Sequence, residues 1–153
     1  CAPDEDIMLA TAKGKAIRFA VDDIRVFAGR TSTGVRGIKL AEGDEVISMS
    51  VLKHVDVTPE ERFAYLKAAN KLRGADEEGM EAEEGAADIS LSAERFKELQ
   101  AKEQFLLTAT NGGFGKRTSA YEYRLTGRGG QGITNMSLTK KNGGEVVATF
   151  PVT

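Results

Sequence analysis

Arginine and lysine residues that lie near glycines give this sequence its clearest capacity for chemistry. A guanidinium group binds phosphate through planar, charge-assisted hydrogen bonds, and glycine lets a backbone approach a phosphate closely because it has no side chain. The candidate phosphate-binding side chains are Arg18, Arg30, Arg36, Lys116, Arg117, Arg124 and Arg128. The candidate phosphate-approach glycines are Gly127, Gly129, Gly130 and Gly132. The alternative is that these glycines serve strand turns and that the arginine among them is only solvated.

The sequence offers no group of residues typical of a catalytic or metal site. Cys1 is the only cysteine and His54 the only histidine, which excludes a zinc site built from these two residue types. We interpret His54 as a solvated loop residue, because no G-x-S-x-G motif accompanies it. The glycines at 127, 129 and 132 match G-x-G-x-x-G, but a β-type run follows them where a dinucleotide site needs a helix. We therefore predict no catalytic residue, no metal and no cofactor.

Composition indicates a cytoplasmic protein without membrane contact. No run approaches the roughly 18 apolar residues that a membrane helix needs, and the acidic start of the chain does not resemble a secretory signal. A lone cysteine cannot form an internal disulfide, which suits a reducing compartment. The chain begins with Cys1 rather than Met, which we interpret as a fragment boundary, with a lipid-anchored cysteine as the alternative.

An internal repeat organises the chain. Residues 7–52 and 105–152 share the dipeptides Gly29-Arg30 and Gly127-Arg128 and the glycines Gly34 and Gly132, all at one offset. Each copy reads as four short strands, predicted in the first copy at residues 7–12, 16–20, 34–40 and 45–51. A repeat of ~45–50 residues with four strands is the size of a propeller blade. Two blades cannot close a ring, so we expect missing neighbours or association with other copies.

The segment between the copies has a different character. Thr58-Pro59-Glu60-Glu61 is typical of a capping box that starts a helix, with Phe63, Leu66 and Leu72 on its apolar face and Gly74 as its end. Ser92 caps a second predicted helix, and the acidic residues between the two helices are predicted to be disordered. The expected organisation is therefore a first β-blade at 1–53, an acidic helical insertion at 54–104 and a second, basic β-blade at 105–153.

The charge is distributed unevenly along these parts. Residues 1–53 are neutral, residues 54–104 carry a net charge of −6, and residues 105–153 carry +4. A basic second blade is what a surface that meets phosphates requires.

The repeated segments resemble blades of the C-terminal domain of DNA gyrase A, the subunit that carries this enzyme's cleavage core. The resemblance rests on Gly14-Lys15-Ala16-Ile17-Arg18-Phe19, Gly34-Val35-Arg36-Gly37-Ile38-Lys39-Leu40, Gly113-Phe114-Gly115-Lys116-Arg117-Thr118 and residues 127–133. It covers the two copies in order and leaves the insertion outside.

The resemblance implies a mainly β fold, the β-pinwheel, in which blades exchange strands and duplex DNA bends around a basic rim. It implies a part in ATP-dependent negative supercoiling, with the other blades, the cleavage core of gyrase A and gyrase B as partners. The catalytic tyrosine and the ATP site would belong to other parts of that enzyme, so Tyr121 and Tyr123 are expected to be strand or rim residues.

Two departures from the family pattern leave alternatives open. The family's ring has more blades than two, and residues 127–132 resemble a weakened copy of its glycine-rich box, with Gln131 where the box has lysine. The alternatives are the equivalent domain of topoisomerase IV and a protein-interaction propeller. Open blade edges also favour self-association.

Overall fold

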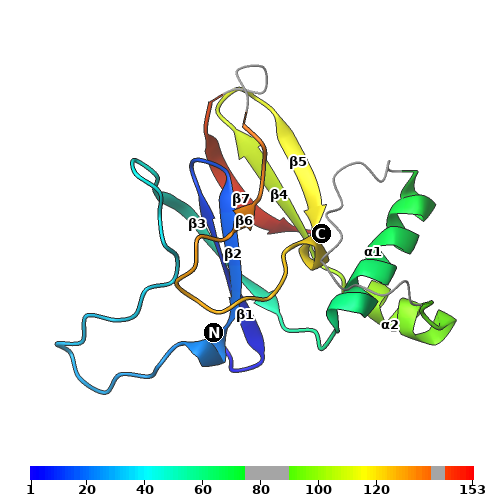
Figure 1. Cartoon of the computed structure of the whole chain (residues 1–153), viewed down its shortest axis with the longest axis horizontal. Coiled ribbons are helices and arrows are strands. Elements are labelled where there is room, and N and C mark those ends of the chain that lie inside the picture. The colour runs from blue at the N-terminus through cyan, green and yellow to red at the C-terminus, as the bar shows by residue number, and fades with distance from the viewer. Residues whose placement is uncertain (75–89, 139–143) are drawn as a thin grey trace. The chain divides into compact units, whose positions relative to one another are not determined.

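The computed structural model describes residues 1–74, 90–138 and 144–153 and forms two units. One unit combines Cys1–His54 with Gln104–Thr153 and holds the β-structure; the other is Val55–Glu103 and holds two helices (Figure 1). The predicted acidic disordered segment lies almost wholly outside the described residues.

The first sheet has the strand order β3-β1-β2-β6. β1 (Glu5–Thr11) and β2 (Lys15–Ala20) form an antiparallel hairpin, and β3 (Val46–Lys53) pairs with the other side of β1. The hairpin turns at Gly14, whose φ of 85° lies in the left-handed region that glycine adopts without steric cost.

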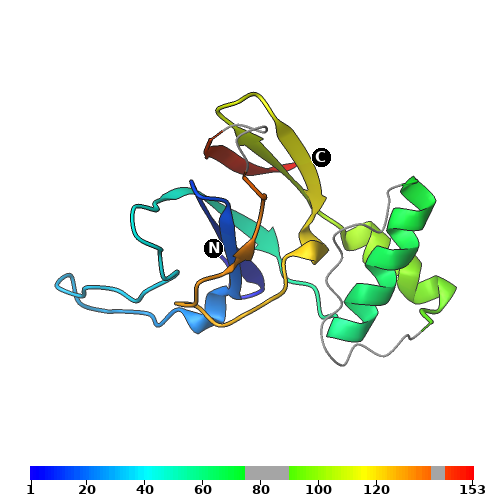
Figure 2. The ribbon, with the colours of Figure 1, turned by 45° about the horizontal axis from the view of Figure 1, so that its top comes forward.

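The fourth strand of this sheet comes from the second copy of the repeat. β6 (Ile133–Thr134) pairs antiparallel with β2, with Lys15 opposite Thr134 and Ala16 opposite Ile133 (Figure 2). This exchange confirms the blade-exchanging architecture that the resemblance implied. The predicted strand at 34–40 is wrong, because these residues form no ladder with any described strand and lie in irregular structure.

The second sheet repeats the first, with the order β5-β4-β7 among the described residues. It consists of β4 (Phe105–Thr110), β5 (Gly115–Ser119) and β7 (Val146–Val152). β4 carries a register shift between Ala109 and Thr110, as β1 does between Ala10 and Thr11. Ala10 faces Ala16 in the first hairpin and Ala109 faces Gly115 in the second, so the two hairpins correspond residue by residue. A short 3-10 helix follows each hairpin: η1 (Val21–Asp23) and η2 (Ala120–Glu122).

The core of this unit has two buried clusters. The cluster between the two sheets contains side chains from both copies: Met8, Ala16, Leu52, Leu106, Ala120 and Tyr123. The other cluster lies on the far face of the first sheet and consists of Ile7, Ile17, Phe19 and Ile38. A polar network crosses the interior between the two sheets, where Asn135 bonds to the Tyr123 hydroxyl, Thr108 and Thr149. Burial raises the pKa of the Tyr123 hydroxyl. Tyr121 and Tyr123 are both buried and lie within or next to η2, so the expectation that they are strand or rim residues is wrong.

The helical unit is built on its caps and a small core. α1 (Pro59–Arg73) begins with a complete capping box between Thr58 and Glu61, and α2 (Ala93–Lys102) begins at the Ser92 cap. Its buried residues are Tyr65, Leu66, Ala69 and Leu99. Of the residues predicted on one apolar face of α1, Leu66 is buried, whereas Leu72 is 76% exposed and lies outside the packed part of that face.

Candidate nucleic-acid interface

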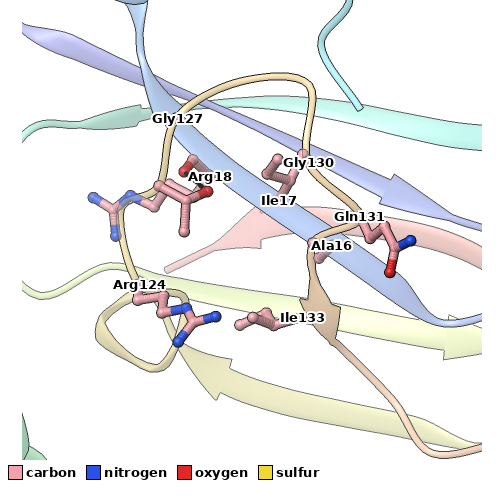
Figure 3. A pocket seen from close by; sticks show the side chains of 10 residues that line it. Ala16, Ile17, Arg18, Arg124, Gly127, Gly130, Gln131 and Ile133 are labelled. Carbon is pink, nitrogen blue, oxygen red and sulfur yellow. Dashed lines mark hydrogen bonds between the residues drawn. The ribbon is translucent and has the colours of Figure 1, made fainter. Parts of the chain in front are cut away.

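A glycine-rich connection between η2 and β6 positions the candidate site. Residues 124–132 run along β2 and arch over it before entering β6 (Figure 3). The Thr126 amide donates to the Arg18 carbonyl at 2.8 Å, and Leu125 forms a parallel bridge with Arg18. This connection is therefore held to the first sheet before its strand exchange begins.

Two of the four predicted glycines, Gly129 and Gly132, have a structural explanation, because both adopt a positive φ that favours glycine. An added Cβ at Gly132, whose φ is 75°, would lie 2.3 Å from the Ala16 carbonyl oxygen, so only glycine fits where β6 meets β2. The Gly129 amide donates to the Gly37 carbonyl at 2.6 Å, and the Gly130 carbonyl accepts from the Lys39 amide at 2.7 Å. Among these four glycines, only Gly127 is exposed and has no neighbouring atom within 4 Å of an added Cβ.

The Arg128 side chain forms hydrogen bonds between this connection and the first copy of the repeat. Its Nε donates to the Asp23 carbonyl at 3.0 Å and its Nη1 lies 3.4 Å from the Arg36 carbonyl oxygen. Its guanidinium nevertheless remains exposed, as do the side chains of Arg36, Lys39 and Arg124. Bonds to neutral carbonyls orient the guanidinium without neutralising its charge. We name the exposed basic residues on these joined segments the basic junction: Arg36, Lys39, Arg124 and Arg128.

The sequence did not single out Lys39, although it lies in the repeated pattern of residues 34–40. Its amide bond to Gly130 places it on the segment next to Arg128. The signal that could have found it was its position in the repeat, since residues 34–40 align with residues 132–138 of the exchanged segment.

Arg18 does not belong to this surface. Its side chain is 7% exposed, its Nη2 lies 2.7 Å from Asp6 Oδ2, and its Nη1 donates to the Ala120 carbonyl at 2.8 Å. A phosphate cannot reach a guanidinium enclosed in this way, so we correct the expectation for Arg18. His54 Nδ1 lies 2.8 Å from the other carboxylate oxygen of Asp6, so His54 is a partner of this buried pair rather than a merely solvated residue.

The remaining predicted residues lie elsewhere. Arg30 is exposed on the long connection after η1. Lys116 and Arg117 are exposed on β5, and the Arg117 guanidinium lies 3.7 Å from the centre of the Phe105 ring. Alternation along a strand directs these two neighbours to opposite faces of the sheet. The structure therefore brings Arg36 and Arg128 together and places Arg124 on the same connection as Arg128, whereas Arg30, Lys116 and Arg117 lie on other segments.

A cavity of about 190 Å³ lies beneath the glycine-rich connection. Arg124, Gln131 and Ile133 line it together with residues of β2 (Figure 3). This volume is below the roughly 300 Å³ at which small-molecule pockets usually begin. In the described part of the chain, no group of three or more His, Cys, Asp or Glu residues is arranged to hold a metal ion. No helix among the described residues is long and apolar enough to cross a membrane.

Comparison with known proteins identifies the family. The family model described as DNA gyrase C-terminal domain, beta-propeller, matches residues 5–53 and 104–153, which leaves the helical unit unmatched. The chain belongs to this family of gyrase C-terminal propeller domains.

The relatives found by sequence are gyrase A proteins. The chain is 54% identical over 165 residues to the DNA gyrase A of Granulibacter bethesdensis and 50% identical over 152 residues to that of Rickettsia bellii. Each alignment covers 99% of this chain but only 18% and 17% of the relative, so the chain spans about a fifth of their length.

Two solved structures share the fold. A DNA gyrase A C-terminal domain aligns with a TM-score of 0.56 at 20% identity, and a topoisomerase IV C-terminal domain with 0.60 at 15%. Both alignments cover 99% of this chain and 32% of the other. The two scores do not separate the two enzymes, whereas the sequence relatives favour gyrase.

Proposed function

We propose that this chain binds duplex DNA without sequence specificity and helps to wrap it as part of gyrase A. In that role it supports ATP-dependent negative supercoiling, and its enzymatic role exists only within the holoenzyme. The proposed partners are DNA, the remaining blades and cleavage core of gyrase A, and gyrase B, all in the cytoplasm.

The observation that carries this proposal is the basic junction on a strand-exchanged gyrase-type blade. Four exposed cations lie on segments joined by backbone bonds, and Arg128 is oriented by two carbonyls. A fixed guanidinium loses less entropy when it binds a phosphate than a freely rotating one. Phosphates carry no base information, so contacts of this kind give affinity and position without sequence specificity.

Salt dependence provides the physical test of a phosphate surface. Each phosphate that a cation neutralises releases counterions, so the logarithm of affinity falls linearly with the logarithm of salt concentration. Bending a short duplex costs on the order of 1–6 kcal/mol, which additional phosphate contacts must offset.

The experiment measures binding of the chain to a short duplex across a salt series, beside three variants. Arg128→Ala and Arg36→Ala should each weaken binding and lower the salt slope by about 1. Lys97→Ala removes the same charge from exposed α2 in the helical unit and serves as the matched control. Unchanged affinity in both junction variants, or no binding at low salt, would assign DNA contact to other blades. Binding of a protein partner in place of DNA would favour the interaction-propeller alternative.

A further inference from the structure

Two of the four cations in the basic junction lie on an irregular segment of the first copy. Arg36 and Lys39 belong to residues 34–43, which form neither strand nor helix. Backbone outside regular structure keeps its conformational freedom unless side chains or hydrogen bonds restrict it. The positions of these two cations therefore depend on what holds this segment in place.

Ile38 holds the segment against the far face of the first sheet. It is 8% exposed and is the one buried residue among residues 34–43. Its side chain packs in the cluster that Ile7, Ile17 and Phe19 form on β1 and β2. Burial of an apolar side chain of this size supplies free energy that fixes the backbone around it. The exposed cations on either side of Ile38 are thereby fixed as well, although Ile38 itself is too buried to reach a phosphate.

Gly37 brings the backbone of this segment close to the sheet. A Cβ added at Gly37 would lie 2.8 Å from Leu9 Cδ1, closer than side-chain carbons normally approach. The absence of a side chain at this position lets the neighbouring Ile38 enter the apolar cluster.

The same segment bonds to the glycine-rich connection that carries Arg128. The Gly129 amide donates to the Gly37 carbonyl at 2.6 Å, and the Lys39 amide donates to the Gly130 carbonyl at 2.7 Å. Ile38 lies between the two residues that make these bonds. Its anchorage therefore lies at the centre of the contact that assembles the basic junction.

We propose that Ile38 is a positioning residue of the basic junction. It fixes the backbone that carries Arg36 and Lys39, so that both cations are ordered before a phosphate arrives. A cation on a fixed backbone loses less conformational entropy on binding than one on a mobile segment. The Arg128 guanidinium shares in this effect, because one of its two carbonyl partners belongs to Arg36. This inference rests on the proposed function, since it concerns how the same surface binds DNA.

Ile38→Ala removes the anchor and leaves every cation of the junction in the chain. Binding to a short duplex should weaken by about tenfold, because two side chains must then be ordered on binding. The salt slope should fall by up to about 2, because Arg36 and Lys39 hold their phosphates less often. Ile38→Val keeps most of the buried side chain and should restore binding to within about twofold.

Leu52→Ala is the matched control for a general loss of stability. It truncates a side chain of the same size in the other buried cluster, where Leu52 is fully buried. Urea unfolding should show that both truncations destabilise the chain. Only Ile38→Ala should change the salt slope, because Leu52 does not belong to the cluster that holds the cations. Equal changes of slope in the two variants would overturn the inference.

A double-mutant cycle with Arg36→Ala separates positioning from a smaller folded fraction. If Ile38 acts through Arg36, removal of the Arg36 side chain should weaken binding less in the Ile38→Ala background than in the wild type. A smaller folded fraction would instead multiply the two effects. Independent effects of the two substitutions would therefore overturn the inference.

Amide hydrogen exchange without DNA tests the anchor directly. Ile38→Ala should speed exchange at the Lys39 and Gly129 amides, which bond across the junction. The Thr126 amide, which bonds to the Arg18 carbonyl, should keep its exchange rate and shows that the sheet is folded. Unchanged exchange at Lys39 and Gly129 would overturn the inference.

The binding data distinguish failure of this inference from failure of the proposed function. Wild-type binding that Ile38→Ala leaves unchanged in affinity and salt slope would overturn the positioning role alone. A wild-type chain that binds no DNA at low salt would overturn the proposed function, and the positioning role with it.

Discussion

Replacing Gly132 with alanine tests whether strand exchange, rather than phosphate approach, requires the glycine-rich connection. Two costs combine at this position. A positive φ costs an L-residue about 1–2 kcal/mol. The added Cβ would also lie 2.3 Å from the Ala16 carbonyl oxygen, a contact that β6 must move to relieve. Loss of the β2–β6 pairing forfeits two or so backbone hydrogen bonds of about 1 kcal/mol each.

We therefore expect Gly132→Ala to lower the free energy of unfolding by about 3–4 kcal/mol. Two matched glycines separate the contributions. Gly34 has a similar φ of 76° but open space around it, so Gly34→Ala should cost about 1 kcal/mol. Gly127 has open space and no positive φ, so Gly127→Ala should stay within about 0.5 kcal/mol.

Urea unfolding followed by circular dichroism measures all three variants. Amide hydrogen exchange at Ile133 and Thr134 reports whether β6 has left β2. The reasoning is refuted if Gly132→Ala costs no more than Gly34→Ala. A Gly132→Ala variant with normal stability and weakened DNA binding would return this glycine to a phosphate-approach role.

Three further predictions follow from the buried pair and the helical unit. Asp6→Ala should destabilise the chain by about 3–5 kcal/mol in urea unfolding, because it leaves the Arg18 charge buried without its carboxylate. The double variant Asp6→Leu with Arg18→Met should recover most of that loss. Thr58→Ala removes the capping box of α1 and should cost about 1 kcal/mol of helical-unit stability, measured by thermal unfolding, with the exposed Ala68→Ser as a control away from the cap. Hydrogen bonds from Lys102 and Arg95 lower the pKa of Glu98 to about 2, and the bond from Arg95 lowers that of Glu61. A carboxyl group whose pKa is lowered by folding stabilises the fold fully above its unfolded pKa and less as the pH falls. The helical signal should therefore decline between about pH 4.3 and pH 2. A Glu98→Gln variant with an unchanged acid profile would contradict this.

Local features of the sequence predicted the parts of this molecule that local physics controls. The capping box at Thr58, the Ser92 cap and the hairpin turn at Gly14 were readable, because a turn or a cap depends on residues a few positions apart. The repeat revealed two blades, and the motifs of those blades indicated the family that the comparisons confirm. Leu72 was misassigned because helical periodicity does not say which part of an apolar stripe a short partner helix covers.

Only the tertiary structure decided which copy of the repeat completes which sheet. Residues 34–40 and 132–138 carry similar patterns, yet β6 forms at 133–134 because the edge of β2 lies within its reach, and 34–40 has no such edge in this chain. The same distinction separates Arg18 from Arg117, which occupy equivalent positions in their hairpins. The Asp6 carboxylate of its own sheet and the Ala120 carbonyl of η2 enclose Arg18, whereas Arg117 remains exposed. Strand pattern and charge are properties of a segment, whereas pairing and burial depend on which distant segment lies against it.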